Sequence, residues 1–149
     1  MRRPSLPAWF EALLRWSLAL FMVLAGVMHF VAPRFYEQIV PPPLPAGPVV
    51  VVSGLAEIAL GVALAFEGTR RRAAWGVVAL LVAVFPANLY MAFSGVVLTD
   101  LPSWMAQPSA AARYGRLPVQ LVFLAWAWLV AERPASHPAE DAALPTPRP

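Results

Sequence analysis

Four long apolar segments, separated by polar or proline-rich connections, dominate the pattern of this chain. They cover about residues 9–31, 48–66, 73–93 and 117–131. A helix of roughly 20 apolar residues is long enough to cross a bilayer, and the first three segments reach or approach that length. The fourth is short, so we expect it to include Arg116 or a little of the sequence before it. The pattern predicts an all-α, polytopic membrane protein with one four-helix transmembrane domain over residues 8–131.

Composition agrees with a membrane protein and excludes several kinds of chemistry. Of the 149 residues, 60% are hydrophobic and 13% are charged, which is about half the charged fraction of soluble domains. The chain has no cysteine, which excludes disulfides, thiolate metal sites and a cysteine nucleophile. No metal site is expected. The arginines lie at segment ends and form no recognition stripe, so we expect a lipid bilayer and no nucleic acid as partner.

The placement of the arginines predicts an orientation. With four spans, the N-terminus, the second connection and the C-terminus lie on one side of the membrane. That side carries Arg2, Arg3, Arg15, Arg70, Arg71, Arg72, Arg133 and Arg148, and the other side carries Arg34, Arg113 and Arg116. Because positively charged loops stay in the cytoplasm, this asymmetry places both termini there.

The connections between the segments differ in character. Residues 33–47 are rich in proline, and we expect Pro41 and Pro42 to hold a stiff, extended strap of polyproline type with no regular helix through its core. Residues 132–149 are rich in proline, alanine and acidic residues, so we expect a disordered cytoplasmic tail.

Each apolar segment contains one strongly polar residue. These residues are His29, Glu57, Asn88 and Gln120, in chain order. With a rise of about 1.5 Å per residue, Glu57 falls near the middle of the membrane and the other three fall in its outer half. Because a charged side chain costs at least about 2.5 kcal/mol at the bilayer centre, it normally faces protein or water and indicates a functional site. We therefore predict a polar intramembrane site in which these residues converge, with Arg116 one turn before Gln120.

The helical phase supports a packed site around Glu57. Gly54, Glu57 and Gly61 share one face of the second segment, and small residues let a neighbouring helix approach closely. In the third segment, Pro86 has no N–H to donate and is expected to kink the helix near Asn88.

Structural interpretations of the same residues stay open. Asn88 and Gln120 also suit hydrogen bonds that join helices, and His29 suits a structural role near a helix end. Glu57 could equally be a buried structural acid paired with His29 or Arg116.

Several strings in order, GVMHFVAPRFYEQIVPPPLP (26–45), SGLAEIALG (53–61), AAWGVVALLVAVFPANLYMA (73–92) and RLPVQ (116–120), resemble the DoxX-like family of small bacterial four-helix membrane proteins. The motif positions carried over are His29, Pro41, Pro42, Glu57, Pro86, Asn88, Arg116 and Gln120. The resemblance implies a multi-pass protein of the bacterial inner membrane. Some relatives in that family are associated with a thiosulfate:quinone oxidoreductase or with the maturation of periplasmic enzymes.

Three functions remain open at this point. The resemblance favours an accessory or assembly subunit for a membrane or periplasmic redox enzyme, without enzymatic activity of its own. A second hypothesis is a subunit that binds a quinone or another lipophile through Glu57 and His29, since a carboxylate and an imidazole suit proton exchange. A third is a small transporter that uses Glu57 as its coupling acid. The sequence names neither the substrate nor the partner.

Overall fold

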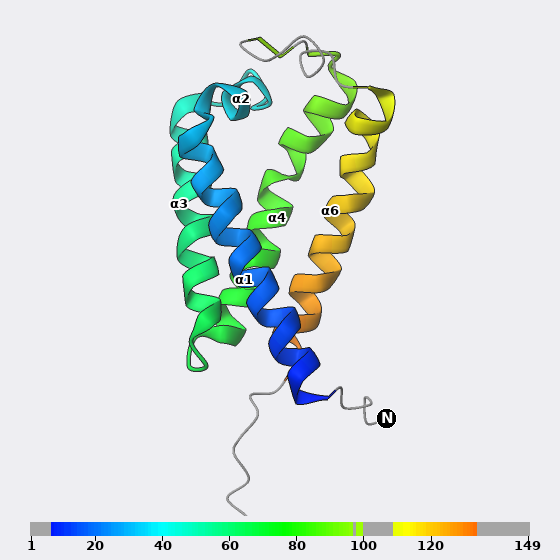
Figure 1. The fold of residues 1–149 in the computed structure, drawn as a ribbon. Coiled ribbons are helices and arrows are strands. Elements are labelled where there is room, and N and C mark those ends of the chain that lie inside the picture. The colour runs from blue at the N-terminus through cyan, green and yellow to red at the C-terminus, as the bar shows by residue number, and fades with distance from the viewer. Residues whose placement is uncertain (1–6, 97, 100–108, 134–149) are drawn as a thin grey trace, which may run out of the picture.

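The computed structural model describes residues 7–96, 98–99 and 109–133, and the regular secondary structure within them is entirely helical. Four of the five helices in these residues are long and apolar enough to cross a membrane, so the prediction of an all-α, multi-pass membrane protein is confirmed at that level. The helices, labelled as in Figure 1, are α1 (Ala8–Val31), α2 (Pro33–Gln38), α3 (Ala46–Ala65), α4 (Arg70–Phe93) and α6 (Ala110–Ala131).

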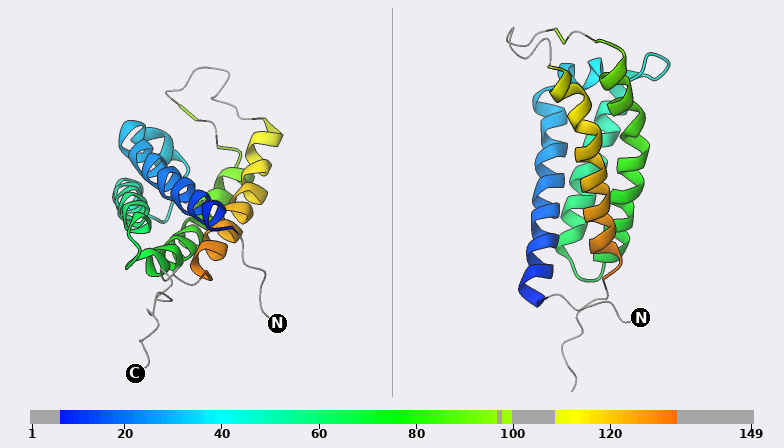
Figure 2. Two further views of the ribbon diagram at one scale, coloured as in Figure 1. Left: turned by 60° about the horizontal axis from the view of Figure 1, so that its bottom comes forward. Right: turned by 90° about the vertical axis from the view of Figure 1, so that its right-hand side faces the viewer.

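The four long helices lie side by side and form a bundle of two pairs (Figure 2). Helix α1 packs mainly against α3, and α4 packs mainly against α6. We call one end of the bundle the basic end: it holds the start of α1, the loop between α3 and α4, and the end of α6. The opposite end, where α2 lies across the bundle, is the cap end (Figure 1).

Glycines bring α1 and α3 into close contact. A Cβ atom added to Gly26 would lie 2.6 Å from the carbonyl oxygen of Gly54, and one added to Gly61 would lie 2.9 Å from that of Ala19. Because these neighbours are backbone atoms, no side-chain rotation could relieve such contacts. The face of α3 that carries Gly54 and Gly61 therefore packs against a helix, as its spacing predicts.

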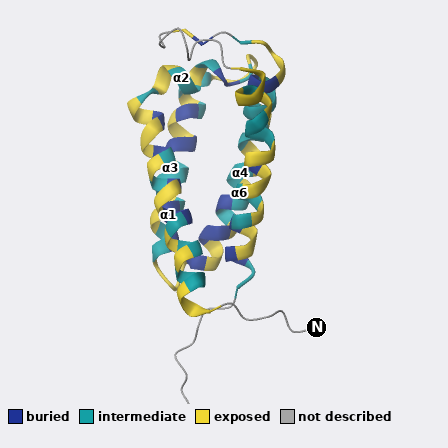
Figure 3. Ribbon diagram, turned by 45° about the vertical axis from the view of Figure 1, so that its right-hand side comes forward, coloured by how far each residue is buried: buried dark blue, intermediate teal, exposed yellow. Residues whose placement is uncertain are grey.

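The main hydrophobic core lies at the basic end, where the two pairs meet. Its fully buried members include Leu18 on α1, Leu64 on α3, Val77 on α4 and Ala127 on α6. Farther from this end the ribbons of the two pairs stand apart, and exposed residues cover their outward sides (Figure 3). Ion pairs surround the basic end as well: Arg15 and Arg70 both pair with Glu67, and Arg133 pairs with Glu11.

The prediction of an extended strap over residues 33–47 is wrong, although no helix passes through Pro41 and Pro42, as expected. Residues Pro33–Gln38 form helix α2, because proline at the first helical position lacks only an N–H that has no helical partner, and its fixed φ suits the helix. The segment around Pro41 and Pro42 forms a turn closed by a hydrogen bond from Leu44 N to Pro41 O (3.0 Å).

Helix α2 and the chain that follows α4 are tied together at the cap end. The backbone N–H of Thr99 donates to Gln38 Oε1 (2.6 Å), and Gln38 Nε2 donates to the carbonyl of Thr99 (3.3 Å). Beneath this tie, Ile39, Met91 and Leu98 form a small buried cluster.

The ends of two long helices are defined locally. Helix α4 continues through Pro86 and ends before Gly95, whose φ of 67° is a conformation that glycine readily adopts after a helix. Helix α6 begins at Ala110, well before Leu117, because Ser109 caps it by accepting a hydrogen bond from Ala112 N (3.2 Å). The predicted tail lies outside the described residues from residue 134 on.

Candidate functional site

His29 on α1 and Glu57 on α3 face each other across the glycine-lined contact. His29 Nδ1 lies 3.2 Å from Glu57 Oε2 and 3.0 Å from the carbonyl oxygen of Ala25. Because a carbonyl only accepts, the Nδ1 proton is directed to Ala25, and the contact with Glu57 is a close approach without hydrogen-bond geometry. Glu57 Oε2 is buried and has no hydrogen-bond donor among the described residues. A buried oxygen that lacks a hydrogen-bond donor within the protein is a strong candidate for a hydrogen bond to a bound molecule.

Tyr36 on α2 completes the wall around His29. The two rings stack with their centroids 3.8 Å apart, which fixes the imidazole beneath the cap. Burial, and then the negative charge of Glu57, raise the pKa of the Tyr36 phenol above its ordinary value. The phenol therefore stays protonated and can donate a hydrogen bond across the physiological pH range.

A cavity of about 210 Å³ lies beside these groups. Its polar lining consists of the side chains of His29, Tyr36, Ser53, Glu57 and Asn88. Its apolar lining comes from the turn after α2, from α3 and from α4, namely Ile39, Val40, Pro41, Leu44, Val49, Val50, Ala83, Val84, Pro86 and Ala87. An apolar cavity with a few convergent polar groups is the usual form of a small-molecule site.

Asn88 and Gln120 form a second polar group, between α4 and α6. Asn88 Nδ2 donates to Gln120 Oε1 (2.7 Å), and Gln120 Nε2 donates to the carbonyl of Leu81 (2.6 Å). Leu81 directly precedes Val82, whose carbonyl lacks its usual helical donor because Pro86 has no N–H. Side chains from neighbouring helices commonly bond to the backbone near a membrane proline. These bonds agree with the structural interpretation of Gln120, whereas Asn88 also lines the cavity.

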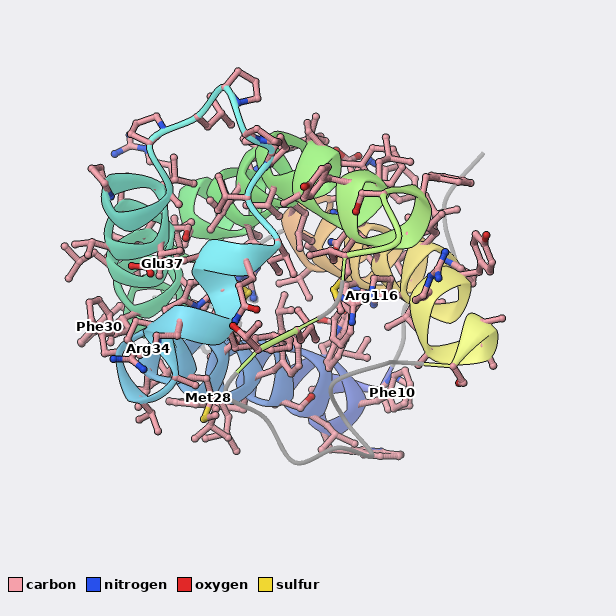
Figure 4. The ribbon with its side chains drawn as sticks, turned by 90° about the horizontal axis from the view of Figure 1, so that it is seen from above. Phe10, Met28, Phe30, Arg34, Glu37 and Arg116 are labelled. Carbon is pink, nitrogen blue, oxygen red and sulfur yellow. The ribbon has the colours of Figure 1, made fainter. Side chains whose placement is uncertain are left out.

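Arg116 points from α6 toward the middle of the bundle when the molecule is seen from the cap end (Figure 4). Its Nε donates to the carbonyl of Ala112 one turn earlier, at 3.4 Å. It does not line the cavity.

The structure thus divides the predicted set of five polar residues. His29, Glu57 and Asn88 line one cavity, Gln120 supports Asn88 from behind, and Arg116 stands apart. Tyr36 and Ser53 were not foreseen. Tyr36 follows His29 by seven residues, the spacing of two helical turns, but Pro33 between them was taken as the start of an extended segment. Ser53 lies one turn before Glu57 on α3, which is a usable signal for a shared lining.

In the part of the chain that the structure describes, no group of three His, Asp or Glu side chains could hold a metal ion.

Comparison with known proteins gives a family without an assigned function. The family model described as "Domain of unknown function (DUF8561)" matches residues 18–131. The match covers most of the chain, including all four long helices in large part and every residue of the cavity, so the chain belongs to this family. No curated protein and no solved structure matches the chain.

Proposed function

Since the family has no assigned function, we propose one from the site: the protein binds a small lipophile that carries hydrogen-bonding oxygens, of which a quinone is the class that fits best. The buried oxygen of Glu57 in the wall of an apolar cavity carries this proposal. A carboxyl group accepts a hydrogen bond from a hydroxyl when ionised and donates one to a carbonyl when protonated. It therefore suits both the quinol and the quinone form.

His29 and Asn88 support the same conclusion. With the Nδ1 proton of His29 directed to Ala25, a neutral imidazole has its other nitrogen as an acceptor. Asn88 donates one amide hydrogen to Gln120 and retains a second hydrogen and its carbonyl oxygen for a ligand. The wall thus offers an acid, a base and an amide within one low-dielectric space.

The cellular setting that we propose is that of a DoxX-like accessory subunit. In this setting the protein lies in the bacterial inner membrane with the basic end in the cytoplasm, and it serves a membrane or periplasmic redox enzyme. The eight-to-three distribution of arginines supports the orientation. The motif resemblance supports the redox partner.

The alternative is an assembly subunit whose polar residues only fix the packing of the helices. The bonds between Asn88, Gln120 and Leu81 agree with that interpretation. Glu57 does not, because a purely structural acid would be expected to have a hydrogen-bond donor for its buried oxygen. Glu57 therefore favours the binding function.

The test is quinone binding by the full chain reconstituted in lipid nanodiscs, followed by the quenching of tryptophan fluorescence. Glu57→Gln should weaken binding at least about tenfold, which corresponds to about 1.4 kcal/mol. Glu67→Gln is the matched control, because it makes the same change just beyond the basic end of α3 and should leave the affinity unchanged. Equal affinity of all three proteins, or no binding by the wild type, would reject the proposed function.

A further inference from the structure

The cavity reaches the molecular surface along the seam between α3 and α4. Val50, Ser53 and Glu57 line it from the inside, whereas Ala83 and Pro86 on α4 are exposed and line it from the outside. The outer surface beside the seam is apolar: Val52 on α3 is 66% exposed, and Ala79 on α4 is exposed as well. The mouth of the cavity therefore faces the side of the bundle that lipid would cover.

The spacing of residues on the two antiparallel helices explains why this seam is open. Near the basic end, Leu60 of α3 fills the space over Gly76 of α4, where an added Cβ would lie 2.5 Å from Leu60 Cδ2. Seven residues farther toward the cap end on each helix, and on the same face, stand Ser53 and Ala83. Because both side chains are small, the space at this level stays empty, whereas Leu60 fills the equivalent space nearer the basic end.

One helical turn closer to the cap end, a second pair of residues again faces across the seam between α3 and α4. Eleven residues from Leu60 and from Gly76, again on the same faces, stand Val49 and Ala87, and both line the cavity. The opening thus follows two successive levels at which neither helix carries a side chain as large as leucine. It is a consequence of the sequence of both helices and needs no movement of the backbone.

The size of the cavity limits what fits inside it. A cavity of about 150 Å³ accommodates benzene, so about 210 Å³ accommodates one substituted ring. A hydrocarbon tail finds no room beside that ring and would have to leave through the opening.

We propose that the ligand is an amphiphile with a ring-sized polar head and a hydrocarbon tail, and that it enters sideways from the bilayer between α3 and α4. The head lies against Glu57 and His29, and the tail passes Ala83 and Pro86 into the lipid. This inference rests on the proposed function and adds to it the class of ligand and the route of entry.

The test compares a tailless, methoxy-substituted benzoquinone with its decyl derivative, both titrated into the full chain in nanodiscs. Ala83→Leu places a large side chain in the opening and leaves the polar wall unchanged. It should weaken binding of the decyl derivative about tenfold and binding of the tailless ring less than about threefold. Ala79→Leu is the matched control, because Ala79 is exposed on α4 one turn nearer the basic end and does not line the cavity. It should change neither affinity.

The outcomes separate this inference from the proposed function. If neither quinone binds the wild type, the proposed function fails and the inference fails with it. If both bind and Ala83→Leu weakens them equally or not at all, the function stands and the route between α3 and α4 is rejected.

A second measurement keeps the test valid if Ala83→Leu does not fold. A quinone with a photoreactive group on its tail should label wild-type peptides that contain residues 82–87, in competition with the unmodified decyl derivative. Labelling confined to α1 or α6 would overturn the inference.

Discussion

The two halves of this bundle are built from the same kinds of apolar residue, yet only one of them is closed. At the basic end, Leu18, Leu64 and Val77 are completely buried, and ion pairs surround the core. At the cap end, a cavity of about 210 Å³ separates α3 from α4, and polar side chains line it.

The difference shows what holds a membrane bundle together. Lipid tails are as apolar as leucine, so helices associate through close packing and hydrogen bonds and not through the removal of apolar surface from water. Where a large side chain meets a small one, as Leu60 meets Gly76, the seam closes. Where two small ones meet, as at Ser53 and Ala83, it stays open. We therefore expect the closed half to contribute more to stability than the open half.

The largest effect is expected in the closed half, from Leu64→Ala. The leucine is fully buried, and its truncation should lower the free energy of unfolding by about 2–5 kcal/mol because a cavity remains. Leu44→Ala, the same change at the exposed edge of the cavity, should cost less than about 1 kcal/mol. Unfolding in mixed detergent micelles measures both, and equal losses would contradict the distinction between the halves.

A smaller effect is expected where the open half is held by hydrogen bonds. Asn88→Ala leaves Gln120 Oε1 without its donor and should cost about 0.6–2 kcal/mol. Because the two side chains act together, the double variant with Gln120→Ala should cost less than the sum of the single changes. Strict additivity in the same unfolding assay would show that the bond between them contributes nothing.

The smallest effect concerns pH and the cap. The pKa of Tyr36 is raised in the folded protein, so its neutral form is favoured by folding. The resulting stability is complete below the ordinary pKa of 10.0 and is lost as pH rises through the higher folded value. The wild type should therefore lose more stability than Tyr36→Phe on going from neutral pH to above that value. Parallel pH profiles for the two proteins would count against this assignment.

The sequence was sufficient for the elements whose physical signals are local. Apolar length predicts four spans, and the spacing of Gly54 and Gly61 predicts the face of α3 that meets another helix. The start of α6 was missed because the segment from Ala110 to Arg116 is not apolar enough to count as membrane-spanning, whereas its Ser109 cap and alanine run form a helix irrespective of hydropathy. Helix α2 was missed because Pro33 was taken as a breaker, although it stands at a position where proline favours a helix.

The candidate site was predictable in part, for a similar reason. The cost of polar groups in lipid brings His29, Glu57 and Asn88 together, and the sequence shows where each of them lies in its span. The cavity itself was not predictable, because it depends on which residues of α3 face which residues of α4. The separate position of Arg116 likewise depends on the rotation of α6, which the spacing of apolar residues leaves undetermined.

The hydrogen bonds between Gln38 and Thr99 limit how far the two helix pairs can separate at the cap end. The two helix pairs meet in the core at the basic end, and Phe93 at the other end of α4 lies about 24 Å from Val77 in that core. A rotation of one pair by about 5° around the core would therefore displace its far end by roughly 2 Å. A hydrogen bond of 2.6 Å between Thr99 N and Gln38 Oε1 does not survive such a displacement. At the cap end, the separation of the pairs is thus limited by the bonds of Gln38 together with the buried cluster of Ile39, Met91 and Leu98, and the pairs move apart there only when these contacts break.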